Sequence, residues 1–165
     1  MFKKFVILVL LLGLTGCGRI SVYKYKAHDI AAPTGENISI LHVPREIYVQ
    51  EIDGKGKYSP SGSSDLFPYS AAEIELIPGI RTLSLKYSSG RQYSINKSNI
   101  TFNFAPGKKY FIQSKVQYAK KETGGLQASV SYRIDECGST EEAAYNEAAK
   151  KADQWLAPYV PACGK

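Results

Sequence analysis

The sequence of 165 residues predicts a mainly β fold, an antiparallel β-sandwich or small barrel followed by one C-terminal α-helix. Apolar and polar residues alternate along several short segments, which is typical of strands that bury one face. Pro and Gly recur in the connections between these segments, where they favour turns. Near the C-terminus, apolar residues instead recur at spacings of three and four, which is the pattern of an amphipathic helix.

The alternation is clearest in five segments between residues 73 and 134. In each, the apolar side chains occupy positions of one parity, so one face of a strand would be turned to a common core. The apolar sets are Ile74 and Leu76; Leu83, Leu85 and Tyr87; Ile100, Phe102 and Phe104; Tyr110, Ile112, Val116 and Tyr118; and Leu126, Ala128, Val130, Tyr132 and Ile134.

The connecting segments favour antiparallel pairing. Parallel neighbours need crossovers of roughly a dozen residues or more, and no helical stretch separates the five segments. Pro or Gly instead stands where tight turns need a fixed or positive φ. The turn segments are IPGI at 77–80, SSGR at 88–91, APGK at 105–108 and KKETGG at 120–125.

One helix is expected from residue 139 to about Leu156. Ser139 and Glu142 have the spacing of a capping box, and Pro158 and Pro161 then end the helix. The residues expected on its buried face are Tyr145, Ala148, Ala152, Trp155 and Leu156.

The N-terminus has the order of an export signal. Lys3 and Lys4 precede an apolar run at 5–12, which is shorter than the roughly 20 residues of a membrane span. The next segment, LTGC at 14–17, resembles the lipobox of bacterial lipoproteins. That resemblance implies cleavage before Cys17 and attachment of diacylglycerol to its sulfur. The alternative is an ordinary signal peptide whose Cys17 enters a disulfide.

This resemblance places the protein in a bacterial cell envelope, anchored to the membrane by lipid. Two or more acyl chains hold a protein stably. Gly18, rather than Asp, follows Cys17, and in the Gram-negative pattern this favours the outer membrane, facing the periplasm. The expected organisation has four parts. A signal peptide at 1–16 precedes a lipidated N-terminus and tether at 17–37, which offers a first strand at ISVYKY (20–25). A β-sandwich domain at 38–135 and a helix with a disulfide-tied tail at 136–165 follow.

Two cysteines, Cys137 and Cys163, remain if Cys17 is lipidated. Disulfides persist outside the cytoplasm, and two is the number that pairs. A metal site would need more Cys or His at ligand spacing, and the two histidines, His28 and His42, are far from either cysteine. We therefore expect a disulfide, no metal and no cofactor.

The central block also resembles a family. The order IELIPGIRTLSLKY and then ITFNFAPGKKYFIQSKV is similar to the PEGA-type and related small domains of bacterial lipoproteins, over roughly residues 38–118. The resemblance implies a transthyretin-like β-sandwich and offers no catalytic residues.

The remaining composition argues against an enzyme. G-x-S-x-G, H-E-x-x-H, C-x-x-C and phosphate-loop motifs are absent from the sequence. His28 falls in the expected tether, His42 has the position of a partly buried strand histidine, and Glu73 and Glu75 have that of solvated residues. With two of the 21 basic residues in the leader, the mature chain carries a scattered net charge of +4, so a nucleic-acid partner is not expected.

The segment 54–70, GKGKYSPSGSSDLFPYS, is the candidate recognition loop, because long structureless loops in compact domains are commonly functional or disordered. Its basic and aromatic side chains suit docking on protein or stacking on sugar; the alternative is that the aromatics cover a sheet edge. Two functions follow: a non-catalytic interaction module with an envelope-protein partner, or a module that binds carbohydrate such as peptidoglycan. The candidate residues are Lys55, Lys57, Tyr58, Phe67 and Tyr69.

Overall fold

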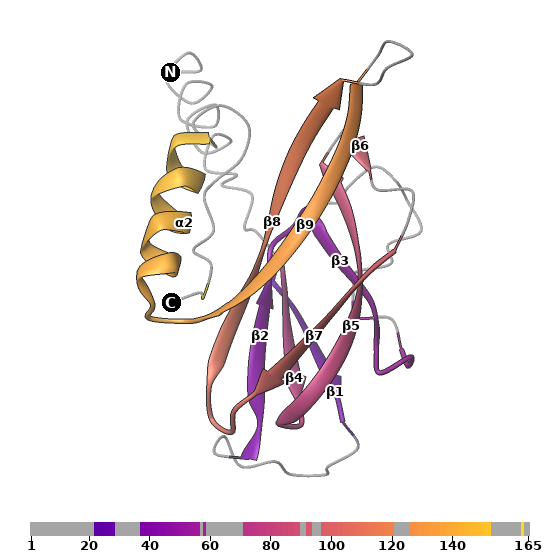
Figure 1. Ribbon diagram of the computed structural model, residues 1–165. Helices are drawn as coiled ribbons and strands as arrows, with labels where there is room; N and C mark the ends of the chain where they lie inside the picture. The colour runs from indigo at the N-terminus through magenta and orange to yellow at the C-terminus, as the bar shows by residue number, and fades with distance from the viewer. Residues whose placement is uncertain are drawn as a thin grey trace, which may run out of the picture.

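The computed structural model describes residues 22–28, 37–56, 58, 71–89, 92–93, 97–120, 126–152 and 163. Within these ranges lie nine strands and one helix (Figure 1), so the prediction of a mainly β fold with one C-terminal helix is confirmed. The elements are β1 (Tyr23–Ala27), β2 (Ser39–Val43), β3 (Ile47–Ile52), β4 (Ala72–Leu76), β5 (Gly79–Ser89), β6 (Gln92–Tyr93), β7 (Ser98–Phe104), β8 (Lys109–Lys120), β9 (Leu126–Glu136) and α2 (Thr140–Ala152).

The strands form two sheets. One has five strands in the order β1-β4-β2-β8-β9; the other has four, in the order β3-β5-β6 with β7 also paired to β5. In Figure 1 the α2 helix lies beside the five-stranded sheet, and β8 and β9 extend beyond the other strands as a long twisted hairpin.

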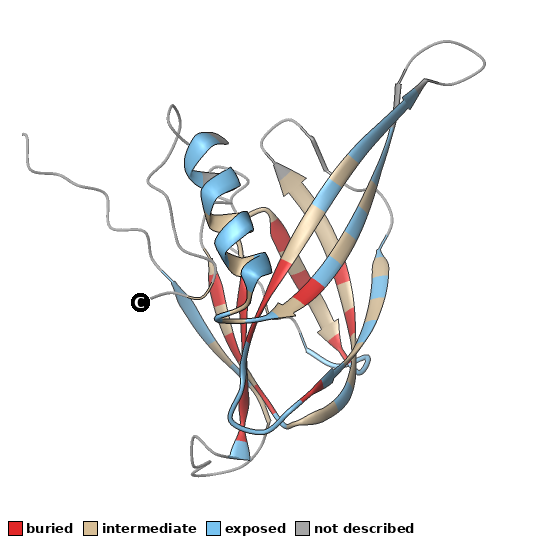
Figure 2. Ribbon diagram, turned by 60° about the vertical axis from the view of Figure 1, so that its left-hand side comes forward, coloured by how far each residue is buried: buried red, intermediate tan, exposed pale blue. Residues whose placement is uncertain are grey.

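A single apolar core joins the two sheets. Leu41 of β2 and Ile74 of β4 meet Val49 of β3 and Leu83 of β5 in one buried cluster. Buried residues accordingly appear on strands of both sheets in Figure 2. The sequence alternation identified the inward faces where the strands cover the core, because side chains two residues apart share one side of a strand. In the outer part of β8 and β9 the prediction of a buried face is wrong, since Tyr118 is 54% exposed and Ala128 is exposed.

Three aromatic rings extend the core at the end where β7 leads into β8. Phe102, Phe104 and Tyr110 pack with their centroids 5.0 to 5.2 Å apart, all in tilted or edge-to-face contact. The Tyr110 hydroxyl accepts a hydrogen bond of 2.9 Å from the Ala105 N–H, which satisfies the polar end of a buried ring.

The prediction of purely antiparallel pairing is wrong for the five-stranded sheet. β1 runs parallel to β4, with Tyr25 opposite Ile74, and β2 runs parallel to β8, with Leu41 opposite Tyr110. The remaining pairs are antiparallel. Parallel neighbours need a long crossover. In this fold the crossover between two parallel partners consists of other strands, whereas the prediction of antiparallel pairing considered only helical crossovers.

The four predicted turns separate into two kinds. Residues 88–91 and 120–125 do connect antiparallel neighbours, β5 to β6 and β8 to β9. The segments 77–80 and 105–108 instead carry the chain from one sheet to the other, from β4 to β5 and from β7 to β8. Gly79 and Gly107 have positive φ values of 113° and 69°. Turn residues specify the reversal of the chain, but not whether the next strand pairs with the last or stacks over it.

Candidate functional site

Several sequence-predicted site residues lie outside the described residues. These are Cys17, Lys57, Phe67 and Tyr69. The described part of the chain contains no helix that is both long and apolar enough to cross a membrane.

Two of the five candidate binding residues in the loop, Lys55 and Tyr58, are described, and both have structural roles. Lys55 is exposed and closes a tight turn with Ile52. The Ile52 N–H donates to Lys55 O and the Lys55 N–H donates to Ile52 O, both at 3.0 Å. The Tyr58 N–H donates to Val49 O at 3.0 Å, and its ring meets Tyr25 edge-on with centroids 6.5 Å apart. Tyr58 is partly buried and packs against the core.

The predicted disulfide is present. Cys137 and Cys163 are joined by an S–S bond of 2.03 Å with Cα atoms 5.9 Å apart. Glu142 brings a carboxylate near the two sulfurs, but bridged sulfurs are not thiolates and are not available as metal ligands.

The start of α2 follows the predicted capping box with one change. The Glu142 N–H donates to the Ser139 hydroxyl at 3.3 Å, while the Glu142 carboxylate accepts from the Gly138 N–H at 2.6 Å rather than from Ser139. The helix contacts the sheet through Tyr145, whose ring lies 5.6 Å from that of Phe111. Ala148, predicted on the buried face, is exposed, and Trp155 and Leu156 lie outside the described residues.

The outer face of the five-stranded sheet carries a charged network that the sequence interpretation missed. Lys24 pairs with Glu73 at 3.2 Å, and Lys26 with Glu75 at 3.9 Å, across the parallel β1–β4 pair. His28 Nε2 lies 3.3 Å from Glu75 Oε2. The expected tether offered a first strand at 20–25, and β1 overlaps that segment. Glu73 and Glu75 are 20% and 26% exposed and take part in ion pairs, so the expectation that they are ordinary solvated residues is wrong.

His42 extends the same network, and its prediction as a partly buried strand histidine is confirmed. The residue is 9% exposed in β2, and its Nδ1 lies 3.9 Å from Glu73 Oε2. Desolvation by burial is the main cause that lowers the pKa of His42 below its usual value of 6.5, and Lys109 and Lys24 act in the same direction. Glu73 and Glu142 oppose this shift. We therefore expect a neutral imidazole at neutral pH.

The network links β1, β2 and β4 through side-chain contacts. Lys24 and Lys26 pair with the two carboxylates, and among the described residues the buried His28 Nδ1 and His42 Nε2 atoms have no hydrogen-bond partner. Among the described residues, His28, His42, Glu73 and Glu75 do not bring three potential metal ligands within 4.8 Å of one another. The complementary Lys-x-Lys and Glu-x-Glu spacings were the available sequence signal for the β1–β4 pair.

The outer face of the other sheet carries a polar ladder. The Thr82 and Thr101 hydroxyls lie 3.1 Å apart, and the Ser84 hydroxyl donates to Asn99 Oδ1 at 2.7 Å. Ile80, two residues before Thr82 on the same face of β5, is 70% exposed. Hydroxyl, amide and exposed aliphatic groups together suit contact with a polar ligand such as a sugar.

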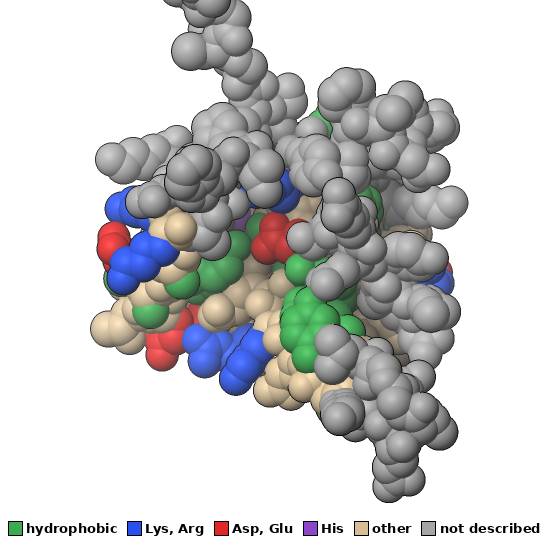
Figure 3. Space-filling view, turned by 90° about the horizontal axis from the view of Figure 1, so that it is seen from above, with side chains coloured by type: hydrophobic (Ala, Val, Ile, Leu, Met, Phe, Trp, Pro, Cys, Tyr) green, Lys and Arg blue, Asp and Glu red, His purple; other side chains and the backbone are tan. Residues whose placement is uncertain are grey.

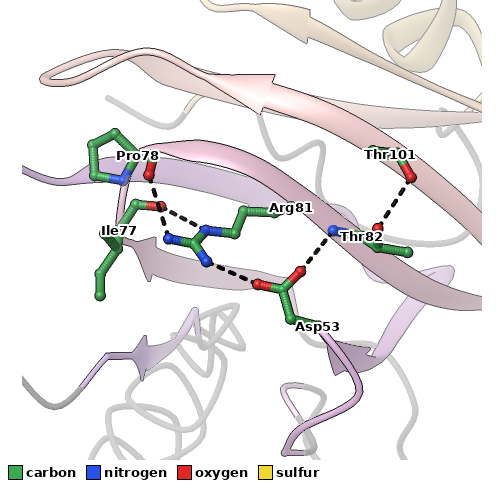
Figure 4. Close-up of polar contacts among 6 residues, drawn as sticks. All are labelled: Asp53, Ile77, Pro78, Arg81, Thr82 and Thr101. Atoms are coloured by element: carbon green, nitrogen blue, oxygen red, sulfur yellow. Dashed lines mark hydrogen bonds and ion pairs between the residues drawn. The ribbon is translucent and has the colours of Figure 1, made fainter.

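A second polar cluster, drawn in Figure 4, fixes the end of this sheet. The Arg81 guanidinium donates to Ile77 O at 3.0 Å and Pro78 O at 3.3 Å, and pairs with Asp53 at 2.9 Å. Asp53 also accepts from the Thr82 N–H at 2.9 Å, and that hydrogen bond, ahead of Arg81, lowers the pKa of Asp53. Asp53 has φ +51°, so this aspartate holds a left-handed turn in place.

Basic side chains do not form a single patch on the face shown in Figure 3, where the blue lysines and arginines lie at several separate places. On this face the described basic residues are therefore scattered, as the sequence predicts.

The fold and its surfaces define a two-sheet β protein with a C-terminal helix held by a disulfide. Comparison of the chain with known protein families, curated proteins and solved structures found no match.

Proposed function

We propose that this protein is a lipoprotein of a bacterial cell envelope, anchored through Cys17, with a folded body that serves as a non-catalytic interaction module. The observation that carries the proposal is LTGC at 14–17, directly after a basic and apolar leader. The Cys137–Cys163 disulfide supports it, because such bridges persist in oxidising compartments outside the cytoplasm.

Gly18 after Cys17 favours the outer membrane, with the body facing the periplasm. For the fold, we propose a relative of the transthyretin-like sandwich of PEGA-type domains. Two stacked sheets with one core support this, whereas the parallel β1–β4 and β2–β8 pairs depart from an all-antiparallel arrangement.

Fractionation of Cys17→Ala and Cys17→Ser variants tests the anchor. The wild-type chain is expected in the membrane fraction and to incorporate a labelled fatty acid. Both variants should lose the label, and any exported variant should be released in soluble form. Retention of either variant in the membrane fraction with its label would exclude Cys17 as the lipidation site.

A second candidate function is binding of a glycan such as peptidoglycan. The polar ladder on the four-stranded sheet favours it, because Thr82, Thr101, Ser84 and Asn99 present hydroxyl and amide groups in register on one face. The full chain should then sediment with purified peptidoglycan, and Asn99→Ala should reduce the amount that sediments. A chain that stays in the supernatant would eliminate this candidate and leave the protein-interaction role.

A further inference from the structure

The outer half of the β8–β9 hairpin, here called the arm, comprises residues 114–120 and 126–132. It projects from the two-sheet body in both Figure 1 and Figure 2. β2 pairs with β8 only up to Phe111, whereas β8 and β9 continue together to the pair Lys120 and Leu126. Within the part of the chain that the structure describes, the arm is therefore a two-stranded ribbon without a third strand.

The backbone of β9 presents hydrogen-bonding groups along its outer edge. The Cys137 N–H donates to Lys109 O at 2.9 Å, and these two residues follow the pair Tyr110 and Glu136 by one step in the register of the hairpin. In an antiparallel pair such hydrogen-bonded positions alternate. The N–H and C=O groups of Ala128 and Val130 consequently point away from β8.

This edge lacks the devices that usually prevent strand addition. Proteins commonly protect sheet edges with charges, Pro or bulges. The stretch Leu126–Tyr132 contains no charged residue and no Pro, and its register with β8 is unbroken. By contrast, the edge strand β1 carries Lys24 and Lys26, and β3 contains an irregularity between Val49 and Glu51.

The edge strands β6 and β7 are also uncharged, but β6 has only two residues and β7 belongs to the sheet that covers the core. The arm instead projects from the body, and of its described residues only Tyr132, at its base, packs against the core, so a second strand would meet it without first displacing the four-stranded sheet (Figure 2).

The side chains of the arm divide into two faces. Val116, Tyr118, Ala128 and Val130 share the parity of the core residue Ile112. On this apolar face Tyr118 is 54% exposed, Ala128 is exposed and Val130 is half-buried. The opposite face carries polar residues, including the exposed Ser129 and Ser131.

We propose that two copies of this chain associate by antiparallel pairing of their β9 edges about a two-fold axis at Ser129. This axis places Leu126 opposite Tyr132 and Ala128 opposite Val130 of the second copy, so the whole uncharged stretch overlaps itself. The positions brought together are those whose backbone groups point outward, as antiparallel pairing requires.

A second copy fits this edge because the edge is self-complementary. Pairing about Ser129 continues the apolar face of one arm into the apolar face of the other and opposes no like charges within the uncharged stretch. Such an isologous contact closes on itself and gives a dimer rather than a fibre. The resulting four-stranded sheet has the order β8-β9-β9-β8, with the second pair from the other copy. The pairing does not depend on whether Cys17 is lipidated.

Cysteine cross-linking of the full exported chain tests this register. At the two-fold axis, Ser129 meets its own symmetry mate at a non-hydrogen-bonded position, where Cα atoms lie about 4.5 Å apart and a disulfide can form. Ser131 is the matched control, because it shares the exposed polar face but lies roughly 13 Å along the strands from its own symmetry mate. After mild oxidation, non-reducing electrophoresis should show a dimer for Ser129→Cys, and monomer for Ser131→Cys and for the wild type.

A second variant tests the role of the backbone. Val130→Pro removes an N–H that points away from β8, so it should leave the hairpin intact and abolish cross-linking in the Ser129→Cys chain; Val130→Thr should leave cross-linking unchanged. Circular dichroism checks that each variant folds. The proposal is overturned if Ser129→Cys stays monomeric, if Ser131→Cys cross-links as well, if folded Val130→Pro still cross-links, or if Ser129→Cys is captured by a different protein.

Discussion

The Cys137–Cys163 disulfide joins the end of β9 to the tail beyond α2 and closes a loop with a sequence separation of 26 residues. Removing the bridge returns about 12 cal/mol/K of entropy to the unfolded chain for a loop of this length. At 25 °C this corresponds to about 3.5 kcal/mol. We therefore expect the double variant Cys137→Ser, Cys163→Ser to lose about 3.5 kcal/mol of unfolding free energy and roughly 7 to 14 °C in Tm.

Urea unfolding followed by far-UV circular dichroism measures this loss. The wild-type chain treated with reductant is the matched control, because reduction breaks the same bridge without changing the sequence, and its curve should overlay that of the double variant. If both curves stay within about 1 kcal/mol of the oxidised wild type, the loop-closure argument is refuted. The helix and tail would then unfold separately from the two sheets.

Three further predictions concern the core, the Asp53 turn and the His42 network. Leu41→Ala should cost about 3 to 5 kcal/mol in urea unfolding because Leu41 is fully buried between the sheets; a loss below about 1 kcal/mol would contradict the core assignment. Asp53→Ala should lower the unfolding free energy by roughly 1 to 2 kcal/mol, because it removes hydrogen bonds and leaves Ala at a strained positive φ. Asp53→Asn should lower it less, because Asn tolerates that φ and still accepts a hydrogen bond from the Thr82 N–H. Equal costs would show that the turn does not depend on this side chain. The pKa of His42 is lower in the folded than in the unfolded chain, so the stability present above pH 6.5 should decline as the pH falls through and below that value. His42→Gln should flatten this part of a Tm-against-pH profile. An unchanged slope would contradict the lowered pKa of His42.

The strands that the sequence predicted well are those whose burial pattern is local. Ile74 and Leu76, or Leu83 and Leu85, alternate with polar residues because one face of each strand meets the core, and this can be read from neighbouring positions. The capping residues Ser139 and Glu142 and the Cys137–Cys163 pair were predictable for the same reason, since short motifs and cysteine count carry the information.

The features that the sequence did not predict depend on distant pairing. β1 lies parallel to β4, so Lys24 and Glu73 meet across 49 positions of the chain, and no local pattern specifies that contact. The turn at Pro78 was read as a hairpin because Pro and Gly encode a reversal of the chain, not the sheet to which the next strand belongs. Ala148 has helical spacing with Tyr145, yet is exposed.

Mass spectrometry of the mature N-terminus tests the central claim, that this is a lipid-anchored envelope protein, most directly. The chain should be extracted from the membrane fraction of a bacterium that exports it and digested before analysis. The account predicts that the first residue is Cys17, carrying diacylglycerol on its sulfur. An N-terminal peptide that still contains the leader, or a Cys17 without lipid or in a disulfide, would contradict the account.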